Sequence, residues 1–283
     1  MTARLEPPAL GTVMWQDMRK LPAFARRDLL IMWSYRFSFF SDWLGIALQV
    51  LVFYFVGRLV DPARLPTFGG NRTSYLEFVA IGLVFTSFMQ IGLARIVTAT
   101  RQEQLMGTLE SLLVTPTAPP TLQLGLVSYD IVYAPIRTGV FLAALALLFD
   151  IQLSISGLFP TLLIIVAFLP FVWGVGLIGA AAVLRFRRST GIAFGTNILT
   201  GASSTYFPLS VMPDWLKAIA RLNPITIALQ GVREALLGGA GVADIAGAIV
   251  QLLPIGIISL GVGLGLFQLA LSWERRRGTL GLY

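Results

Sequence analysis

Long apolar runs are the feature that most limits what this chain can fold into. A helix needs about 20 consecutive apolar residues to cross the roughly 30 Å hydrocarbon layer of a bilayer. Windows of this kind lie at about residues 37–60, 75–97, 124–149, 157–184 and 245–273. With 56% hydrophobic and only 12% charged residues, the composition is that of a multi-pass membrane protein. We therefore expect an all-α membrane protein.

A sixth window is shorter and more polar. Residues 191–207 read "GIAFGTNILTGASSTYF", in which hydroxyl and amide side chains interrupt the apolar run. We expect a sixth span here, followed by a broken helical segment. Residues 1–283 are thus predicted to form one transmembrane domain of six helices.

The distribution of Lys and Arg predicts the orientation in the membrane, because cytosolic loops are enriched in these residues. With a cytosolic N-terminus, fourteen basic residues fall in the cytosol, six fall outside, and Arg137 lies within a span. The cytosolic set is Arg4, Arg19, Lys20, Arg26, Arg27, Arg36, Arg95, Arg101, Arg185, Arg187, Arg188 and Arg275–Arg277. Both termini are therefore expected in the cytosol. Orientation explains the net charge of +7 better than nucleic-acid binding does.

The segment before the first span, residues 12–35, has amphipathic periodicity. Apolar side chains recur at spacings of three and four, from Met14 to Met32, and most basic residues lie on the other side. This pattern predicts an interfacial helix with Trp15 and Trp33 at headgroup depth. A plain membrane anchor fits the pattern equally well. The polar start of the chain lacks the features of a cleaved signal peptide, so we expect it to be retained.

The residue types that are absent exclude several kinds of chemistry. The chain has no Cys and no His, which excludes disulfides, Cys or His metal sites and Ser-His or Cys-His catalysis. Neither lysine follows the glycine pattern of a phosphate-binding loop. We expect no catalytic residue, no bound metal and no cofactor on this chain.

The stretch "EQLMGTLESLLVTP", residues 103–116, lies in the predicted cytosolic loop after the second span. Leu105, Leu109, Leu112 and Leu113 share one face of a helix that Pro116 would end. Two turns are too short to be stable alone in water, so the helix must lie on something. Periodicity alone leaves two candidates open, the membrane surface and a groove on another protein.

A second interrupted segment, residues 208–239, follows the predicted fifth span. Pro213 and Asp214 favour the start of one helix, and Asn223-Pro224 favours its end. A second helix is predicted through Arg233 and Glu234, with a stop at Gly238-Gly239. Two short helices with apolar faces suggest a re-entrant hairpin in the outer leaflet. A loop lying on the surface is the alternative.

Both segments resemble motifs of one family. "RQEQLMGTLESLLVTP" is similar to E-x-x-x-G-T-L-E-x-L-L-x-(S/T)-P, found after the second span of ABC type-2 permeases, the membrane subunits of bacterial ATP-driven exporters. "YFPLSVMPDWLKAIARLNPITIALQGVREALLGG" resembles their segment after the fifth span, with F-P-L-x-x-(L/M)-P-x-W-L, then L-N-P-(L/I)-T and (V/A)-R-(D/E). The order of the motifs, the six spans and the basic N-terminal helix agree with the same family.

The resemblance implies partners and roles. It makes the short cytosolic helix a coupling helix that docks on a separate ATPase subunit, through Glu103, Gly107, Thr108, Leu109, Glu110, Leu112 and Leu113. It makes the second segment part of an outer gate, with Phe207, Pro208, Pro213, Trp215, Asn223, Pro224 and Arg233. It also implies two permeases, identical or homologous, and two nucleotide-binding subunits that bind ATP and Mg²⁺.

A few polar side chains lie within the predicted spans. Asp130 and Arg137 are seven residues apart on the third span, and intramembrane charge of this kind is a functional candidate. A structural pairing or snorkelling of Arg137 is the simpler interpretation. Gln49, Thr196 and Asn197 are candidates for the transport pathway.

These observations predict a permease subunit of an ABC exporter in the bacterial cytoplasmic membrane. The apolar character of the first and fifth spans favours an amphipathic cargo, a hydrophobic drug or a lipid-like molecule. The alternatives are a permease for polysaccharide or peptide, a self-sufficient secondary transporter or channel, and an integral-membrane enzyme.

Overall fold

The computed structural model describes residues 36–60, 65–105, 138–140, 142–143, 146–147, 151, 153–186 and 190–277. The predicted interfacial helix and most of the third span and of the coupling helix lie outside these residues. The described part is mostly helical, which agrees with an all-α membrane protein. The number of membrane spans stays a prediction.

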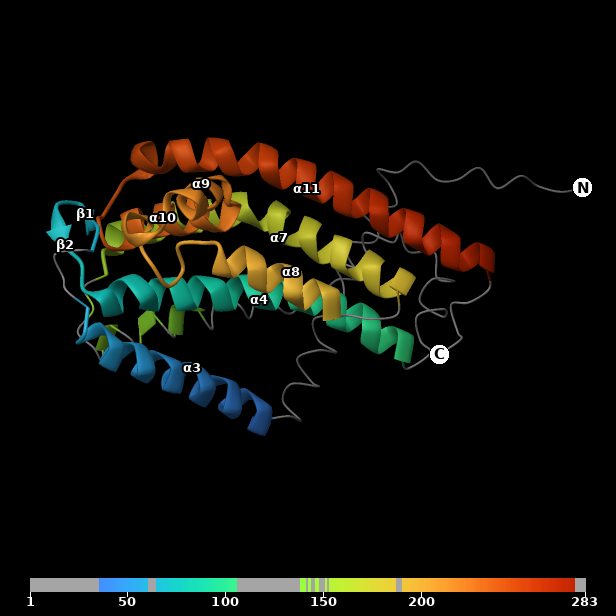
Figure 1. Cartoon of the computed structure of the whole chain (residues 1–283), viewed down its shortest axis with the longest axis horizontal. Coiled ribbons are helices and arrows are strands. Elements are labelled where there is room, and N and C mark those ends of the chain that lie inside the picture. Colours follow the sequence, from blue (N-terminus) through green and yellow to red (C-terminus); the bar gives the residue numbers. More distant parts are fainter. Residues whose placement is uncertain are drawn as a thin grey trace, which may run out of the picture.

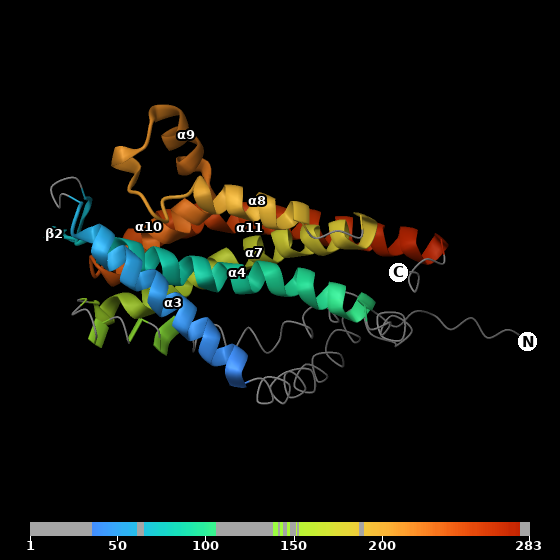
Figure 2. The same ribbon diagram turned by 60° about the horizontal axis from the view of Figure 1, so that its bottom comes forward.

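Three long helices lie side by side along the long axis of the molecule (Figures 1 and 2). They are α4 (Tyr75–Leu105), α7 (Leu158–Phe186) and α11 (Val242–Arg277). The central helix α7 packs against both α4 and α11, and α3 (Arg36–Gly57) packs against α4. At 1.5 Å per residue, α4 is about 46 Å long and α11 about 54 Å, so each exceeds the thickness of the hydrocarbon layer.

Two stretches of the described residues are long and apolar enough to cross a membrane, Ile155–Phe186 and Val242–Glu274. Shorter apolar stretches occur in α3 and α4, at Ala47–Gly57 and Tyr75–Gln90. Helix α11 leaves large apolar side chains such as Ile257, Ile258 and Leu269 exposed along its outer face. An exposed apolar face of this length is expected of a helix that contacts lipid.

The contact between α7 and α11 depends on small residues. A Cβ atom at Gly263 would overlap the carbonyl oxygen of Gly174, and one at Gly174 would overlap Ser259. The hydroxyl of Ser259 donates to the carbonyl of Phe171 at 3.3 Å. The backbones of the two helices therefore touch, as in small-residue contacts between membrane helices.

Helix α8 (Thr190–Gly201) differs from the sixth apolar window predicted from the sequence. The window extends over residues 191–207, whereas the helix has 12 residues and is followed by turns. A helix of this length is about 18 Å long, which is too short to cross the hydrocarbon layer alone. Two side chains donate hydrogen bonds to the carbonyl groups in its last turn. Ser203 Oγ donates to Thr200 O at 2.6 Å, and Asn223 Nδ2 donates to Leu199 O at 2.7 Å. These bonds replace the next helical turn.

Short elements gather at one end of the bundle (Figure 1). Strands β1 (Thr67–Phe68) and β2 (Asn71–Arg72) form an antiparallel hairpin, and Gly69 and Gly70 in its turn have φ values of 58° and 81°. A hairpin turn with two left-handed residues favours glycine at both positions. The 3₁₀ helices η2 (Ile155–Gly157) and η3 (Leu209–Val211) complete this end, together with α9 and α10.

Helices α9 (Asp214–Leu222) and α10 (Pro224–Leu236) begin and end where their sequence indicates. Pro213 precedes α9, and Asn223 caps α10 by accepting a hydrogen bond from the backbone N–H of Ile225 at 3.0 Å. Gly239, with φ of 67°, follows α10. Helix α9 stands away from the bundle in Figure 2, and Ala220 is its one buried residue.

Candidate functional site

A fully buried arginine joins three segments at the end of the bundle that carries the hairpin. Arg233, on α10, is 0% exposed. Its Nε and Nη2 atoms donate to the carbonyl of Phe78 on α4 at 3.1 and 2.8 Å. Nη1 donates to Ser204 O at 2.8 Å, and Nη2 donates to Thr205 O at 3.0 Å, in the turns after α8. We refer to Arg233 and these three carbonyl groups as the arginine junction.

The charge of the arginine junction is compensated by dipoles and by an aromatic ring. The guanidinium carbon lies 3.5 Å from the centre of the Phe78 ring, within the range of a cation–π contact. Among the described residues, no carboxylate forms an ion pair with Arg233. A buried charge is costly unless its hydrogen bonds are made, so this arrangement holds α4, α10 and the turns after α8 in one geometry.

A glycine makes room for the arginine junction. A Cβ atom at Gly82 would lie 2.8 Å from Arg233 Nη2 and would overlap the carbonyl oxygen of Thr205. One turn further along α4, the hydroxyl of Thr86 lies 3.3 Å from that of Thr205. The Thr205 hydroxyl is also 2.6 Å from Ser203 Oγ. Small and hydroxyl-bearing residues thus join α4 to the turns after α8.

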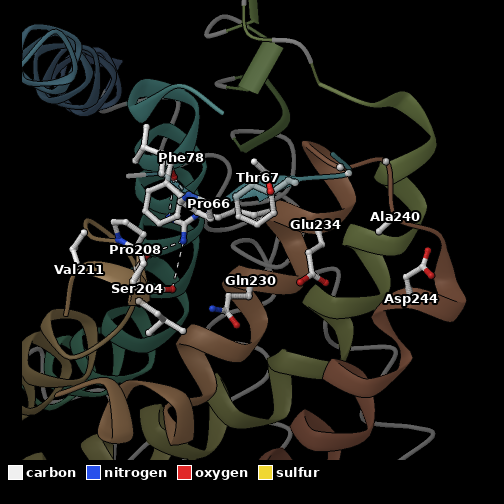
Figure 3. A pocket seen from close by; sticks show the side chains of 18 residues that line it. Pro66, Thr67, Phe78, Ser204, Pro208, Val211, Gln230, Glu234, Ala240 and Asp244 are labelled. Atoms are coloured by element: carbon white, nitrogen blue, oxygen red, sulfur yellow. Dashed lines mark hydrogen bonds between the residues drawn. The ribbon is translucent and has the colours of Figure 1, made fainter. Parts of the chain in front are cut away.

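A cavity of about 1240 Å³ opens beside the arginine junction (Figure 3). The β1–β2 hairpin, η3, α10 and the start of α11 form its walls. Its lining residues are Leu65, Pro66, Thr67, Phe68, Gly69, Phe78, Ser204, Pro208, Leu209, Ser210, Val211, Gln230, Arg233, Glu234, Gly238, Gly239, Ala240 and Asp244. We refer to this cavity as the hairpin pocket. Its lining combines apolar and aromatic walls with two carboxylates and one guanidinium.

Glu234 and Asp244 both line the hairpin pocket (Figure 3). Glu234 lies on α10, outside the predicted spans, and partial burial together with the nearby charge of Asp244 raises the pKa of its carboxyl group. Asp244 also has a local role, because its Oδ2 accepts a hydrogen bond from the backbone N–H of Gly241 at 2.8 Å, at the start of α11. Both carboxylates are exposed, so the pocket holds negative charge that solvent and a ligand can reach.

The predicted gate residues do not form one surface. Pro208 and Arg233 meet at the hairpin pocket, whereas Phe207 and Trp215 point outward with exposed fractions of 58% and 68%. Pro213, Asn223 and Pro224 define the helix ends described above. The structure thus brings two of the seven predicted gate residues together at a cavity.

The structure describes only some of the residues of the other predicted sites. Gln49 on α3 and Asn197 on α8 are exposed, and Thr196 is buried. Glu103 lies near the end of α4, so the first residues of the predicted coupling helix continue that helix. Outside the described residues lie Gly107, Thr108, Leu109, Glu110, Leu112, Leu113, Asp130 and Arg137.

Long helices with apolar outer faces, and a cavity at one end of their bundle, are the features expected of an integral membrane protein. The model of the ABC-2 type transporter family matches residues 19–237, which is most of the chain. The chain belongs to this family, and it is a permease subunit without an ATPase site. Members of the family work with an ATPase subunit. A search of curated proteins found no match to the chain.

Proposed function

We propose that this chain is the membrane subunit of an ATP-driven exporter in the bacterial cytoplasmic membrane. ATP is hydrolysed on a separate nucleotide-binding subunit, and two copies of the permease, or this chain with a homologue, enclose the pathway. Family membership supports the transport role. Export rather than import is what the resemblance to the exporter family implies, and the nature of the cargo is inferred from the residues.

One observation carries the proposed orientation. The ends of α4, α7 and α11 that carry Arg101, Arg185 and Arg275–Arg277 lie at the same end of the bundle (Figures 1 and 2). There the guanidinium of Arg185 lies 5.1 Å from the ring centre of Trp273, a pairing typical of a membrane interface. Basic helix ends favour the cytosol, so the hairpin pocket is assigned to the outer side.

Cysteine labelling tests this orientation. The chain has no native Cys, so single substitutions report one position each. We expect Lys217→Cys, on α9, to react with an impermeant thiol reagent added to intact cells. Gln102→Cys, an exposed position near the end of α4, should react only after permeabilisation. Labelling of Gln102→Cys in intact cells would overturn the orientation.

The proposed cargo is an amphipathic molecule, a hydrophobic drug or a lipid-like compound. Helix α3 exposes Leu48, Val52 and Phe55 with few polar neighbours, which suits an apolar body better than a sugar chain. A conduit for polysaccharide is expected to offer rows of hydrogen-bonding groups. The proposal therefore places α3 against the second permease.

Reconstitution of the permease with its ATPase into liposomes tests the cargo. We expect hydrophobic drugs or lipid analogues to stimulate ATP hydrolysis several-fold and to be moved across the bilayer. Transport of a glycan or a hydrophilic peptide instead would contradict the cargo and leave the exporter intact. Transport driven by an ion gradient without the ATPase would contradict the exporter itself.

A further inference from the structure

The hairpin pocket has the composition of a binding site for a charged ligand. Its described charged lining residues are Glu234, Asp244 and Arg233, two carboxylates against one guanidinium. The guanidinium is committed to the carbonyls of Phe78, Ser204 and Thr205. The pocket therefore presents a net negative charge to a ligand.

Two polar side chains of this pocket have no partner among the described residues. No hydrogen bond or ion pair is formed by the carboxylate of Glu234, and none by the amide of Gln230, one turn earlier on α10. Both groups lie on the wall of the cavity in Figure 3. Glu234 is exposed and Gln230 is half-buried, so both groups can be reached by a ligand that enters the cavity.

The remaining walls favour an apolar body. Phe68 and Phe78 line the pocket together with Leu65, Pro66 and Val211. The Phe68 and Phe78 rings are themselves buried, and Arg233 lies over Phe78, so Val211 at 50% exposure offers much of the open apolar surface. Among the described residues, no group of three or more carboxylates could hold a metal ion. At about 1240 Å³, the cavity is also large enough for an organic molecule of drug size.

We propose that the hairpin pocket binds a monovalent organic cation with an apolar body, with Glu234 as its counter-ion. The apolar walls contact the body of the cation, and the amide of Gln230 fixes its orientation. The inference narrows the proposed amphipathic cargo to cationic amphiphiles. Its link to transport rests on the proposed function. Binding itself requires neither the ATPase nor ATP.

Titration calorimetry with tetraphenylphosphonium and the purified permease, without its ATPase, tests the site. We expect the wild type to bind the cation and Glu234→Gln to bind it about fivefold more weakly, because the substitution removes the counter-ion and keeps the shape. Asp214→Asn is the matched control. It removes a carboxylate at the same end of the molecule, on α9 and outside the pocket, and should leave affinity within about twofold of the wild type.

The pH dependence of the affinity for the cation gives a second readout. Because its raised pKa brings protonation of Glu234 closer to neutral pH, wild-type affinity should fall as the pH is lowered through that value. Affinity of Glu234→Gln should change less over the same range. Neutral triphenylphosphine oxide should bind both proteins alike.

Two results would overturn the inference. One is a wild type that does not bind tetraphenylphosphonium, and the other is equal affinity in Glu234→Gln and the wild type. Neither result bears on the exporter, because the assay contains no ATPase and no transport step. Conversely, a permease that binds the cation but transports nothing with its ATPase would keep the pocket and refute the proposed function.

Discussion

Replacing Arg233 with methionine is expected to lower the stability of the folded protein by about 3–5 kcal/mol. The substitution keeps an apolar stem but removes every donor of the arginine junction. It leaves the buried carbonyls of Ser204 and Thr205 without these hydrogen bonds, and the carbonyl of Phe78 with only its bond inside α4. An unpaired buried polar group costs about 1–3 kcal/mol, and the arginine also holds α4 and the turns after α8 against α10.

The measurement is the thermal unfolding midpoint of the purified protein in detergent, followed by tryptophan fluorescence. Arg233→Lys should fall between methionine and the wild type, because a lysine has one donor position in place of a planar fork. Arg221→Met, an exposed position on α9, is the matched control and should unfold near the wild-type midpoint. A midpoint for Arg233→Met within the error of the wild type would show that the junction does not stabilise the fold.

Loss of the proposed coupling contact is expected to abolish cargo-dependent ATP hydrolysis. Leu109→Asp places a charge on the apolar face of the predicted coupling helix, where burial of an uncompensated carboxylate costs several kcal/mol. Membrane insertion should be unaffected, because residue 109 lies outside the predicted spans. We expect the variant to reach the membrane at the wild-type level and to lose association with the ATPase by more than about tenfold.

Co-purification of the tagged permease with its ATPase measures this effect directly. Leu222→Asp introduces the same charge at the end of α9, at a side chain that is 80% exposed and outside the predicted spans, and should retain the ATPase. Glu110→Ala should weaken association less than Leu109→Asp does, since it removes a side chain without adding a buried charge. Normal association in both coupling variants would refute the assignment of this segment.

The ends of α9 and α10 could be predicted from the sequence because they depend on local chemistry. Pro213 fixes the backbone before α9, Asn223 caps α10, and Gly239 adopts a left-handed conformation after it. Each residue acts on neighbours within a few positions, so the sequence pattern contains the whole cause. The adjacent glycines Gly69-Gly70 also favour a turn. The hairpin was not predicted, because strands of 2 residues are too short to show an alternating pattern.

The arginine junction could not be predicted in the same way. Arg233 and Glu234 are adjacent in the sequence, but successive residues point about 100° apart on a helix, and one is buried while the other lines a cavity. The partner carbonyl of Phe78 is 155 positions away. The end of α8 is determined likewise by Asn223, 24 positions from Leu199. Contacts at such separations depend on packing, which periodicity does not describe.

The continuity of α4 has a mechanical consequence. The first turn of α4 contains Phe78, whose carbonyl accepts hydrogen bonds from Arg233. Its last turn contains Glu103, the first residue of the segment proposed to contact the ATPase. About 37 Å of helix separate these two residues. Helices α7 and α11 each contain an internal proline, whereas α4 contains none. A stiff helix of this length works as a lever: a tilt of about 5° moves the far end by about 3 Å, enough to separate Arg233 from the carbonyl of Phe78.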